Sequence, residues 1–491
     1  MTLRKRATAG VFWVGISTAV NTVFRMLIRY VLVRMLLPAE FGLVAMASMA
    51  IDFLQMFREL GFASALIYRK GDVRKAADTM FISVMVIAVV LFGLANLTAP
   101  LVAVFFRAPE LTTVLRVLSL NILISAFGQV QFSLLAKELA FRAKLLPDLV
   151  PTIVYGVTAV ALALLRFGVW SLVIASLVDA ILTSLLSWIV VPWWKPHLRF
   201  DKQEAKELFD YGKHIMGSSL LVYAITNLDN FFVGRVLGEE ALGLYKGAFD
   251  QANLPATQIS RIIGQVLFPA YSKLQDDLEA MKRAFFRTLH YVALIVTPVT
   301  FGMIAFASPF VITLYGLNWA PAVVPLQILS VYGLLRALAV NMGSVFRAGG
   351  KPHWLTYIAV FRLALMGIFL YPATRYFGLV GVSTLSTLIS IGDFAISAAL
   401  TNQVIHGRLA DYVHALWQPL VFSAAGALAA WWLFSRLAGP HDFIALVIAA
   451  TVLVLVCSTL ALALDSELRR LIAGLLVDAD EIRRRLNGSS S

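Results

Sequence analysis

Five arginines lie deep within apolar stretches of the sequence, namely Arg25, Arg29, Arg58, Arg261 and Arg336. An arginine at the centre of a membrane helix costs about 2.5–3.5 kcal/mol when it faces lipid, so such side chains are expected to face water, a partner or a ligand. The planar guanidinium remains charged and grips the oxygens of phosphates and carboxylates with two hydrogen bonds. The arginines therefore predict an anion-binding site inside the membrane.

The first apolar stretch carries the clearest pattern. Asn21, Arg25 and Arg29 recur every four residues, which places all three side chains along one stripe of a helix. Two like charges on one stripe repel each other, which favours an anion site over a purely structural pairing.

The other charges leave alternatives open. Arg58 precedes Glu59, and the two could form an ion pair that only fixes the helix bundle. Asp52 could be a counter-ion for Arg25 or a carboxylate that gains and loses a proton during transport.

In the second half of the chain, a local ion pair is the simplest interpretation of Lys246 and Asp250, at positions i and i+4. Arg261 follows Pro255, where a kink would open backbone carbonyls toward a cavity. Arg336 has no acidic residue three or four positions away, so its partner must come from another helix, from water or from a ligand.

Composition indicates an all-α membrane protein. The chain has 491 residues, 60% apolar and only 14% charged, with a mean hydropathy of +0.82. Its apolar runs are continuous rather than alternating, which excludes a membrane β-barrel. At about 35 residues per helix and connection, the length allows on the order of fourteen crossings. We expect helices at 9–36, 41–66, 78–104, 111–136, 146–165, 168–192, 214–234, 241–270, 288–315, 321–346, 354–374, 378–403, 413–435 and 442–464.

Basic residues alternate between the connections. Those on one side carry 27 lysines and arginines and those on the other carry 5. Because basic residues accumulate in cytoplasmic loops, both termini are expected in the cytoplasm. The same bias explains the net charge of +13 without nucleic acid as a partner.

A repeat organises the chain. The polar connection 195–213 falls after six expected helices and indicates an N-lobe at 1–194 and a C-lobe at 214–404, followed by two helices at 413–464 and a cytoplasmic tail at 465–491. Arg34–Leu36 with Gly42–Leu43 is echoed, 201 residues later, by Arg235–Leu237 with Gly243–Leu244. Two like-oriented repeats are a plan used by transporters.

Several absences narrow the chemistry. The phosphate-binding pattern GxxxxGK[ST] does not occur, so ATP is not expected as the energy source. The seven histidines lack ligand spacing, and no metal site or catalytic residue is predicted. The outer loops are too short for the domain that a membrane ligase or glycosyltransferase would need, so the protein is not expected to be an enzyme.

The sequence resembles the polysaccharide-transport (Wzx-like) flippases of the MOP exporter superfamily, which also contains the MATE drug exporters, and is most similar to the exopolysaccharide and colanic-acid-type branch. The resemblance extends over nearly the whole chain and rests on the segments Leu36–Gly42, Glu59–Gly61, Lys137–Arg142, Gly168–Leu172, Asn227–Asn230, Gly234–Gly238, Leu242–Tyr245 and Leu267–Lys273.

The resemblance implies a flippase that moves undecaprenyl-pyrophosphate-linked oligosaccharide to the outer leaflet of the bacterial inner membrane. It implies a V-shaped pair of six-helix lobes and a cationic cavity, which Asn21, Arg25, Arg29, Arg58, Arg261 and Arg336 could line. The expected partners are this substrate, membrane lipids, and the polysaccharide polymerase and chain-length machinery. No cofactor is expected beyond a coupling H⁺ or Na⁺, for which Asp52, Asp229 and Asp250 are candidates.

The sequence leaves two rival functions open. An ion-coupled exporter of drugs or small metabolites would need a smaller, more acidic and aromatic cavity, whereas the deep charges here are mostly basic. A membrane enzyme or a non-transporting scaffold for polysaccharide assembly is the other alternative.

Overall fold

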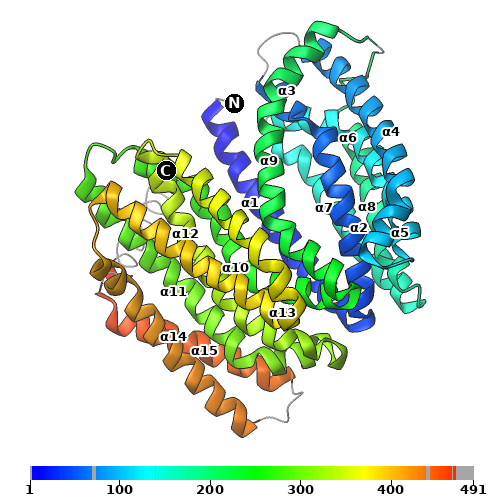
Figure 1. Ribbon diagram of the computed structural model, residues 1–491. Coiled ribbons are helices and arrows are strands. Elements are labelled where there is room, and N and C mark those ends of the chain that lie inside the picture. Colours follow the sequence, from blue (N-terminus) through cyan, green and yellow to red (C-terminus); the bar gives the residue numbers. More distant parts are fainter. Residues whose placement is uncertain are drawn as a thin grey trace, which may run out of the picture. The chain divides into compact units, whose positions relative to one another are not determined.

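A computed structural model describes residues 3–68, 73–138, 140–197, 199–437, 443–466 and 468–470, and these residues form helices and short connections without a strand (Figure 1). The helices are α1 (Leu3–Met35), α2 (Pro38–Glu59), α3 (Phe62–Tyr68), α4 (Val73–Phe106), α5 (Leu111–Leu118), α6 (Leu120–Lys137), α7 (Phe141–Leu164), α8 (Val169–Val190), α9 (Lys202–Leu237), α10 (Glu239–Ser272), α11 (Leu278–Phe310), α12 (Val323–Ala348), α13 (His353–Ile405), α14 (Leu409–Leu437) and α15 (Phe443–Leu464). A π-helical turn (Val311–Tyr315) and a 3₁₀ helix (Leu317–Ala322) connect α11 to α12.

The all-α membrane architecture expected from composition is confirmed. Among the described residues, eleven helical segments are long and apolar enough to cross a membrane. The helix α13 spans 53 residues and covers the two expected helices 354–374 and 378–403. The boundary between them is marked by Gly378, where the backbone leaves the helical conformation (φ 59°, ψ −143°). The total of fourteen crossings stays a prediction.

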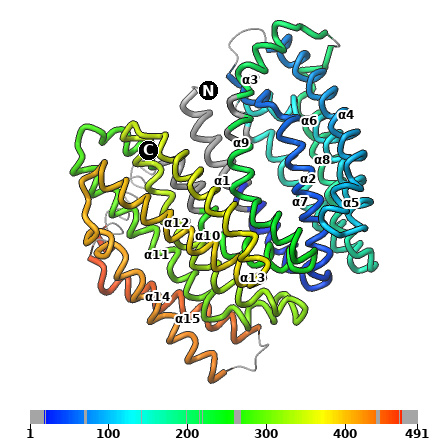
Figure 2. The backbone as a smooth tube through the Cα atoms, viewed as in Figure 1, coloured from blue at the N-terminus to red at the C-terminus, as the bar shows by residue number. Residues whose placement is uncertain are grey.

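The chain forms two compact units. Unit 1 comprises Met1–Lys246 with Gly367–Val382, and unit 2 comprises Gly247–Met366 with Ser383–Ser491. Within unit 1, α7 packs against α1 and α8, and α9 packs against α2 and α4. Within unit 2, α11 packs against α12, α14 and α15, and α14 lies beside α15 (Figure 2). The predicted division into lobes at 195–213 stays a prediction, and the compact units divide elsewhere.

One apolar cluster of unit 1 explains how α1 is held. Ile28 and Leu32 of α1, and Leu36 directly after it, pack with Ala159 of α7 and Leu172 of α8. At about 100° per residue, these positions fall on the same face of the helix as Asn21, Arg25 and Arg29. This face of α1 therefore meets α7 both through Arg25 and through the apolar side chains.

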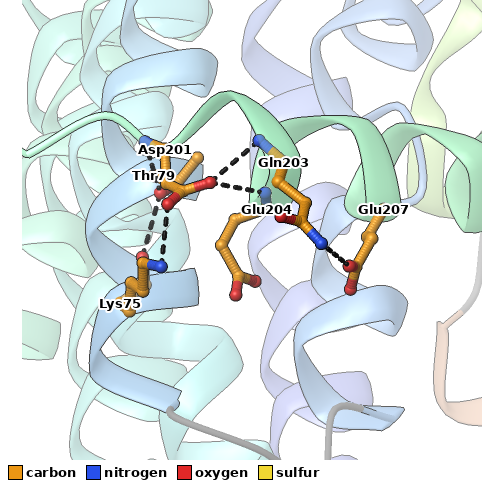
Figure 3. Close-up of polar contacts among 6 residues, drawn as sticks. All are labelled: Lys75, Thr79, Asp201, Gln203, Glu204 and Glu207. Carbon is orange, nitrogen blue, oxygen red and sulfur yellow. Dashed lines mark hydrogen bonds and ion pairs between the residues drawn. The ribbon is translucent and has the colours of Figure 1, made fainter.

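The connection between α8 and α9 is shorter than expected, because α9 begins at Lys202 rather than near 214. Asp201 caps the helix by accepting hydrogen bonds from the backbone N–H groups of Gln203 (2.8 Å) and Glu204 (3.0 Å) (Figure 3). The same carboxylate pairs with Lys75 of α4 at 2.7 Å. A capping residue with an ion-pair partner is a strong start signal, which explains the early beginning of α9.

The two copies of the repeated sequence pattern contact each other in unit 1. A Cβ atom on Gly42 would overlap the carbonyl oxygen of Glu239, and one on Gly243 would overlap that of Pro38. Pro38 and Glu239 each stand four residues before an echoed glycine, so the two copies make the same contact with each other. Such reciprocity is typical of contacts related by a twofold axis.

A second pair of positions supports the repeat. Phe167-Gly168 precedes α8 and Phe377-Gly378 divides α13, and the two glycines have nearly the same backbone angles (φ 57°, ψ −131° and φ 59°, ψ −143°). Positive φ is readily adopted by glycine alone, so both junctions depend on this residue.

Candidate functional site

The guanidinium of Arg25 is exposed and anchored at one point. Its Nη2 atom donates a hydrogen bond to the hydroxyl oxygen of Thr152 on α7, at 3.2 Å. Asp179 on α8 and Tyr155 on α7 lie close enough for the charge of Arg25 to act on both. Three helices of unit 1 therefore bring one cation, one carboxylate and two hydroxyl groups together.

The rest of the α1 stripe adds a second cation and an amide. Arg29 and Asn21 are half-buried, and the Oδ1 atom of Asn21 is buried without a hydrogen-bond partner. The structure thus keeps Asn21, Arg25 and Arg29 on one helix face, as their spacing predicts. A guanidinium has five N–H donors, and the bond to Thr152 leaves most of those of Arg25 for a ligand.

Arg58 has a different environment from Arg25. Its side chain is only 4% exposed, and Nη1 donates to the carbonyl oxygen of Ile122 at 3.2 Å and to the hydroxyl of Ser125 on α6. Glu59 lies 3.6 Å away, as the ion-pair alternative expected. These bonds join α2 to α6, so the geometry favours a role for Arg58 in the packing of unit 1.

A second charged group lies in unit 2. Arg362 and Asp393, both on α13, pair at 3.3 Å with side chains 21% and 13% exposed. Arg336 on α12 donates a hydrogen bond to the hydroxyl of Tyr332 at 2.8 Å, and its charge also acts on Asp393. The hydrogen-bond partner of Arg336 thus lies on its own helix, and the choice among another helix, water and a ligand for its charge stays a prediction.

Arg261 lies in α10, and its side chain falls outside the described residues. Its place in a binding site accordingly stays a prediction.

The three candidate coupling carboxylates differ in their surroundings. Asp229 is 3% exposed and accepts hydrogen bonds from the hydroxyl of Tyr245 (2.9 Å) and the backbone N–H of Asn230 (2.8 Å). Asp52 is exposed, and the charge of Lys246 acts on it. Asp250 is half-buried and belongs to unit 2. Among the described residues, no group of acidic, histidine or cysteine side chains has the arrangement of a metal site.

The sequence interpretation missed Asp179 and Asp393, the acidic members of the two charged groups. A signal for both was present, since each is the only charged residue in its expected helix, 168–192 or 378–403.

Comparison with known proteins identifies the family. The family model described as "Polysaccharide biosynthesis protein" matches residues 31–324, more than half of the chain. The chain belongs to this polysaccharide biosynthesis family. The similarity to the polysaccharide-transport flippases, expected from the motifs, is thereby confirmed.

Curated relatives of this family member cover most of its length. The teichuronic acid biosynthesis protein TuaB of Bacillus subtilis (strain 168) is 28% identical over 425 residues, 86% of this chain and 88% of TuaB. The lipopolysaccharide biosynthesis protein WzxC of Escherichia coli (strain K12) is 25% identical over 86% of both chains. The succinoglycan biosynthesis transport protein ExoT of Rhizobium meliloti (strain 1021) is 30% identical over 65% of this chain and 64% of ExoT.

Solved structures confirm the fold of this family member. The lipid II flippase MurJ, in an inward closed conformation, aligns with a TM-score of 0.70 and 16% identity over 91% of this chain and 99% of MurJ. An inward-facing MATE multidrug transporter of the MOP superfamily aligns with a TM-score of 0.60 and 18% identity over 80% of this chain and 98% of the transporter. At these identities the similarity concerns the fold, which is that of the MATE and MurJ transporters.

Proposed function

We propose that this protein is a flippase that moves undecaprenyl-pyrophosphate-linked oligosaccharide repeat units across the bacterial inner membrane for surface or exopolysaccharide synthesis. Family membership supports a role in polysaccharide biosynthesis, and the fold supports transport. The single observation that carries the substrate chemistry is the exposed guanidinium of Arg25 on an apolar helix, held at one point by Thr152.

The physical problem is to bring a pyrophosphate and a hydrophilic glycan across about 30 Å of hydrocarbon. Arg25 and Arg29 supply positive charge that attracts the pyrophosphate, and arginine stays charged in a partly dry site. Thr152 orients the Arg25 fork, while Asp179 balances its charge when no substrate is bound. Alternating access by two lobes then exposes the bound head group to the other side.

The charged group of unit 2 supplies a second set of polar contacts in this proposal. Arg362 pairs with Asp393, and the charge of Arg336 also acts on this carboxylate, so an arriving anion would compete with one carboxylate near two cations. Neutral glycan hydroxyls suit the hydroxyl of Tyr332 and the same guanidinium donors.

Transport against a gradient needs a coupling ion, and we propose H⁺ or Na⁺. Asp52 suits this role better than Asp229, because Asp229 is buried and already accepts two hydrogen bonds, whereas Asp52 is exposed. Asp250 remains a third candidate.

The finer architecture belongs to the same proposal. We propose fourteen crossings, arranged as two lobes of six helices plus two C-terminal helices, with both termini in the cytoplasm. The distribution of 27 basic residues against 5 supports this orientation. The proposed partners are the polysaccharide polymerase and the chain-length machinery, and the proposed action is transport rather than catalysis. An exporter of drugs or small metabolites is not favoured, since the relatives named above are named for the biosynthesis of teichuronic acid, lipopolysaccharide and succinoglycan.

The test replaces Arg25 with Ala and with Lys and measures the flipping of a lipid-pyrophosphate oligosaccharide by the purified protein in liposomes. Loss of a charged hydrogen bond of about 1.5–3 kcal/mol predicts roughly 10- to 150-fold weaker capture by Arg25→Ala. Arg25→Lys should retain part of the activity, because its charge remains but its fork is lost. Wild-type flipping by Arg25→Ala would refute the proposed role of this arginine.

Arg58→Ala is the matched comparison on the neighbouring helix α2. Because Arg58 is buried and bonded to α6, its loss should lower the thermal unfolding midpoint. Arg25→Ala should leave that midpoint nearly unchanged, since Arg25 is exposed. The two arginines are thereby separated into a ligand contact and a packing contact.

A further inference from the structure

The structure contains a buried histidine and aspartate pair that the proposed transport site does not use. His290 of α11 and Asp465, directly after α15, are 8% and 3% exposed, and Nε2 of the ring lies 2.6 Å from Oδ2 of the carboxylate. Both groups belong to unit 2. A buried polar pair at this distance must share a hydrogen bond, because an unpaired buried polar group is costly.

The other ring nitrogen fixes the protonation of the pair. Nδ1 of His290 lies 2.8 Å from the carbonyl oxygen of Ala415 on α14. In a regular helix that carbonyl would accept from the N–H of residue 419, but Pro419 has none. A carbonyl oxygen can only accept, so Nδ1 carries a proton and donates it to Ala415.

With Nδ1 protonated, the 2.6 Å contact requires one more proton. Either the ring is an imidazolium that donates to a carboxylate, or a protonated Asp465 donates to a neutral ring. Without this proton, the lone pair of Nε2 would face a carboxylate anion, and the contact would be repulsive. The closed arrangement therefore holds one proton between the two residues.

Asp465 is held in place for this contact by its backbone neighbours. Its N–H donates to the carbonyl oxygen of Ala461 at 2.9 Å, and its Oδ1 accepts from the N–H of Leu468 at 3.0 Å. Asp465 thus directly follows the end of α15. Its Oδ1 atom caps the next turn, and its Oδ2 atom contacts His290 of α11.

Other charged groups face the pair from the packed helices. His290 and Asp465 line a cavity of about 530 Å³ whose titratable lining also includes Glu279, Lys282, Arg283 and Arg287 of α11 and Asp411 and His414 of α14. Lys282 and Asp411 pair at 3.1 Å, which offsets one charge of each sign. The cavity gives solvent a route to the pair.

We propose that His290 and Asp465 form a proton-binding site whose proton fastens the C-terminal end of α15 to α11 and α14. Loss of the proton, as pH rises, releases this end. The ligand is H⁺, and the site is separate from the carboxylates Asp52, Asp229 and Asp250.

The chain carries its own reporter of this release. Cys457 is the only cysteine in the sequence, and it lies with Ala461 on one face of α15, with Asp465 four residues beyond Ala461. Cys457 is 7% exposed, and its thiol donates to the carbonyl oxygen of Phe422 on α14 at 3.4 Å. Release of the end of α15 would expose this thiol.

The experiment measures N-ethylmaleimide labelling of Cys457 in the purified full-length protein across a pH series. Labelling of any thiol rises about tenfold per pH unit below its pKa, because the thiolate is the nucleophile. Opening that releases one proton adds a further factor of about tenfold per pH unit. The wild type should therefore show a slope near two in log rate against pH.

Asp465→Asn is the decisive variant. An asparagine amide can donate to the neutral ring of His290 and still cap Leu468, but it cannot lose a proton in this range. Its slope should fall to about one, while His414→Gln, which changes another histidine of the same cavity, should keep the wild-type slope. Equal slopes for the wild type and Asp465→Asn would overturn the proposal.

A second variant covers the case in which Asp465→Asn does not fold. His290→Gln removes the titratable ring and should also give a slope of about one. A wild-type slope of one would by itself overturn the proposal, whatever the variants do.

Discussion

Gly42 and Gly243 take part in one reciprocal contact, in which each glycine lies against the backbone carbonyl four residues before the other glycine. The N-terminal turns of α2 and α10 approach each other so closely that no side chain fits between them. Because the obstruction is backbone, a flexible side chain cannot move aside to relieve it.

Gly42→Ala should therefore destabilise unit 1. An inserted methyl group in a tightly packed contact costs about 1–3 kcal/mol, and Gly243→Ala should have a similar effect. The thermal unfolding midpoint of the detergent-solubilised protein measures this change. Gly93→Ala in α4 is the control, since no atom lies within 4 Å of the added carbon, and it should match or exceed the wild type. Unchanged midpoints for both substitutions would contradict the close approach.

The surroundings of Asp201 predict that the protein loses stability in acid. Its hydrogen bond to Lys75, followed by those from the backbone at Glu204 and Gln203, lowers the pKa of the carboxyl from 3.8 to about 2. A carboxyl whose pKa is lower in the folded state stabilises the protein above its unfolded pKa of about 4 and loses this contribution as pH falls toward 2. The unfolding midpoint of the wild type should decrease over this window.

Asp201→Asn should reduce that decrease, since an amide can still cap α9 but does not titrate. Lys75→Met removes the ion-pair partner of Asp201 and should bring the pKa of this carboxyl closer to its unfolded value. The decrease in the unfolding midpoint should therefore be smaller than in the wild type. If the wild type and both variants lose stability in parallel between pH 4 and pH 2, the contact of Figure 3 does not lower this pKa.

Replacing Asp393 should leave the positive charge of Arg362 in unit 2 without its partner. Asp393→Ala would leave Arg362 without its carboxylate partner, and removal of one partner from a buried pair costs about 3–5 kcal/mol. We expect the lower half of this range because Arg362 is 21% exposed. Chemical denaturation of the purified protein measures the loss.

Arg362→Leu combined with Asp393→Leu is the informative control. Removing both charges should restore part of the stability, because neither group is then left unpaired. A double variant no more stable than Asp393→Ala would show that the pair does not account for the effect.

Much of the fold could be read from local patterns. The apolar runs of about 20 residues predict membrane helices because the hydrocarbon thickness sets their length. The spacing of four residues between Asn21, Arg25 and Arg29 predicted that their side chains share one helix face. The repeated sequence pattern around Gly42 and Gly243 predicted an internal repeat. The predicted helix start at 214 is wrong, because the polar segment before it contains Asp201, which caps α9 at Lys202.

The sequence by itself determined the membrane class, the helical segments and the presence of deep positive charge, because each depends on residues near one another in the chain. Only the tertiary structure decided which charges are balanced and by what. Arg58 and Arg25 look alike in the sequence, yet one is bonded to α6 and buried while the other is exposed beside Thr152 and Asp179. His290 and Asp465 are 175 residues apart, and their meeting depends on the packing of α11, α14 and α15 and on the carbonyl that Pro419 leaves without a donor. Burial and partner choice are long-range properties, and no local spacing encodes them.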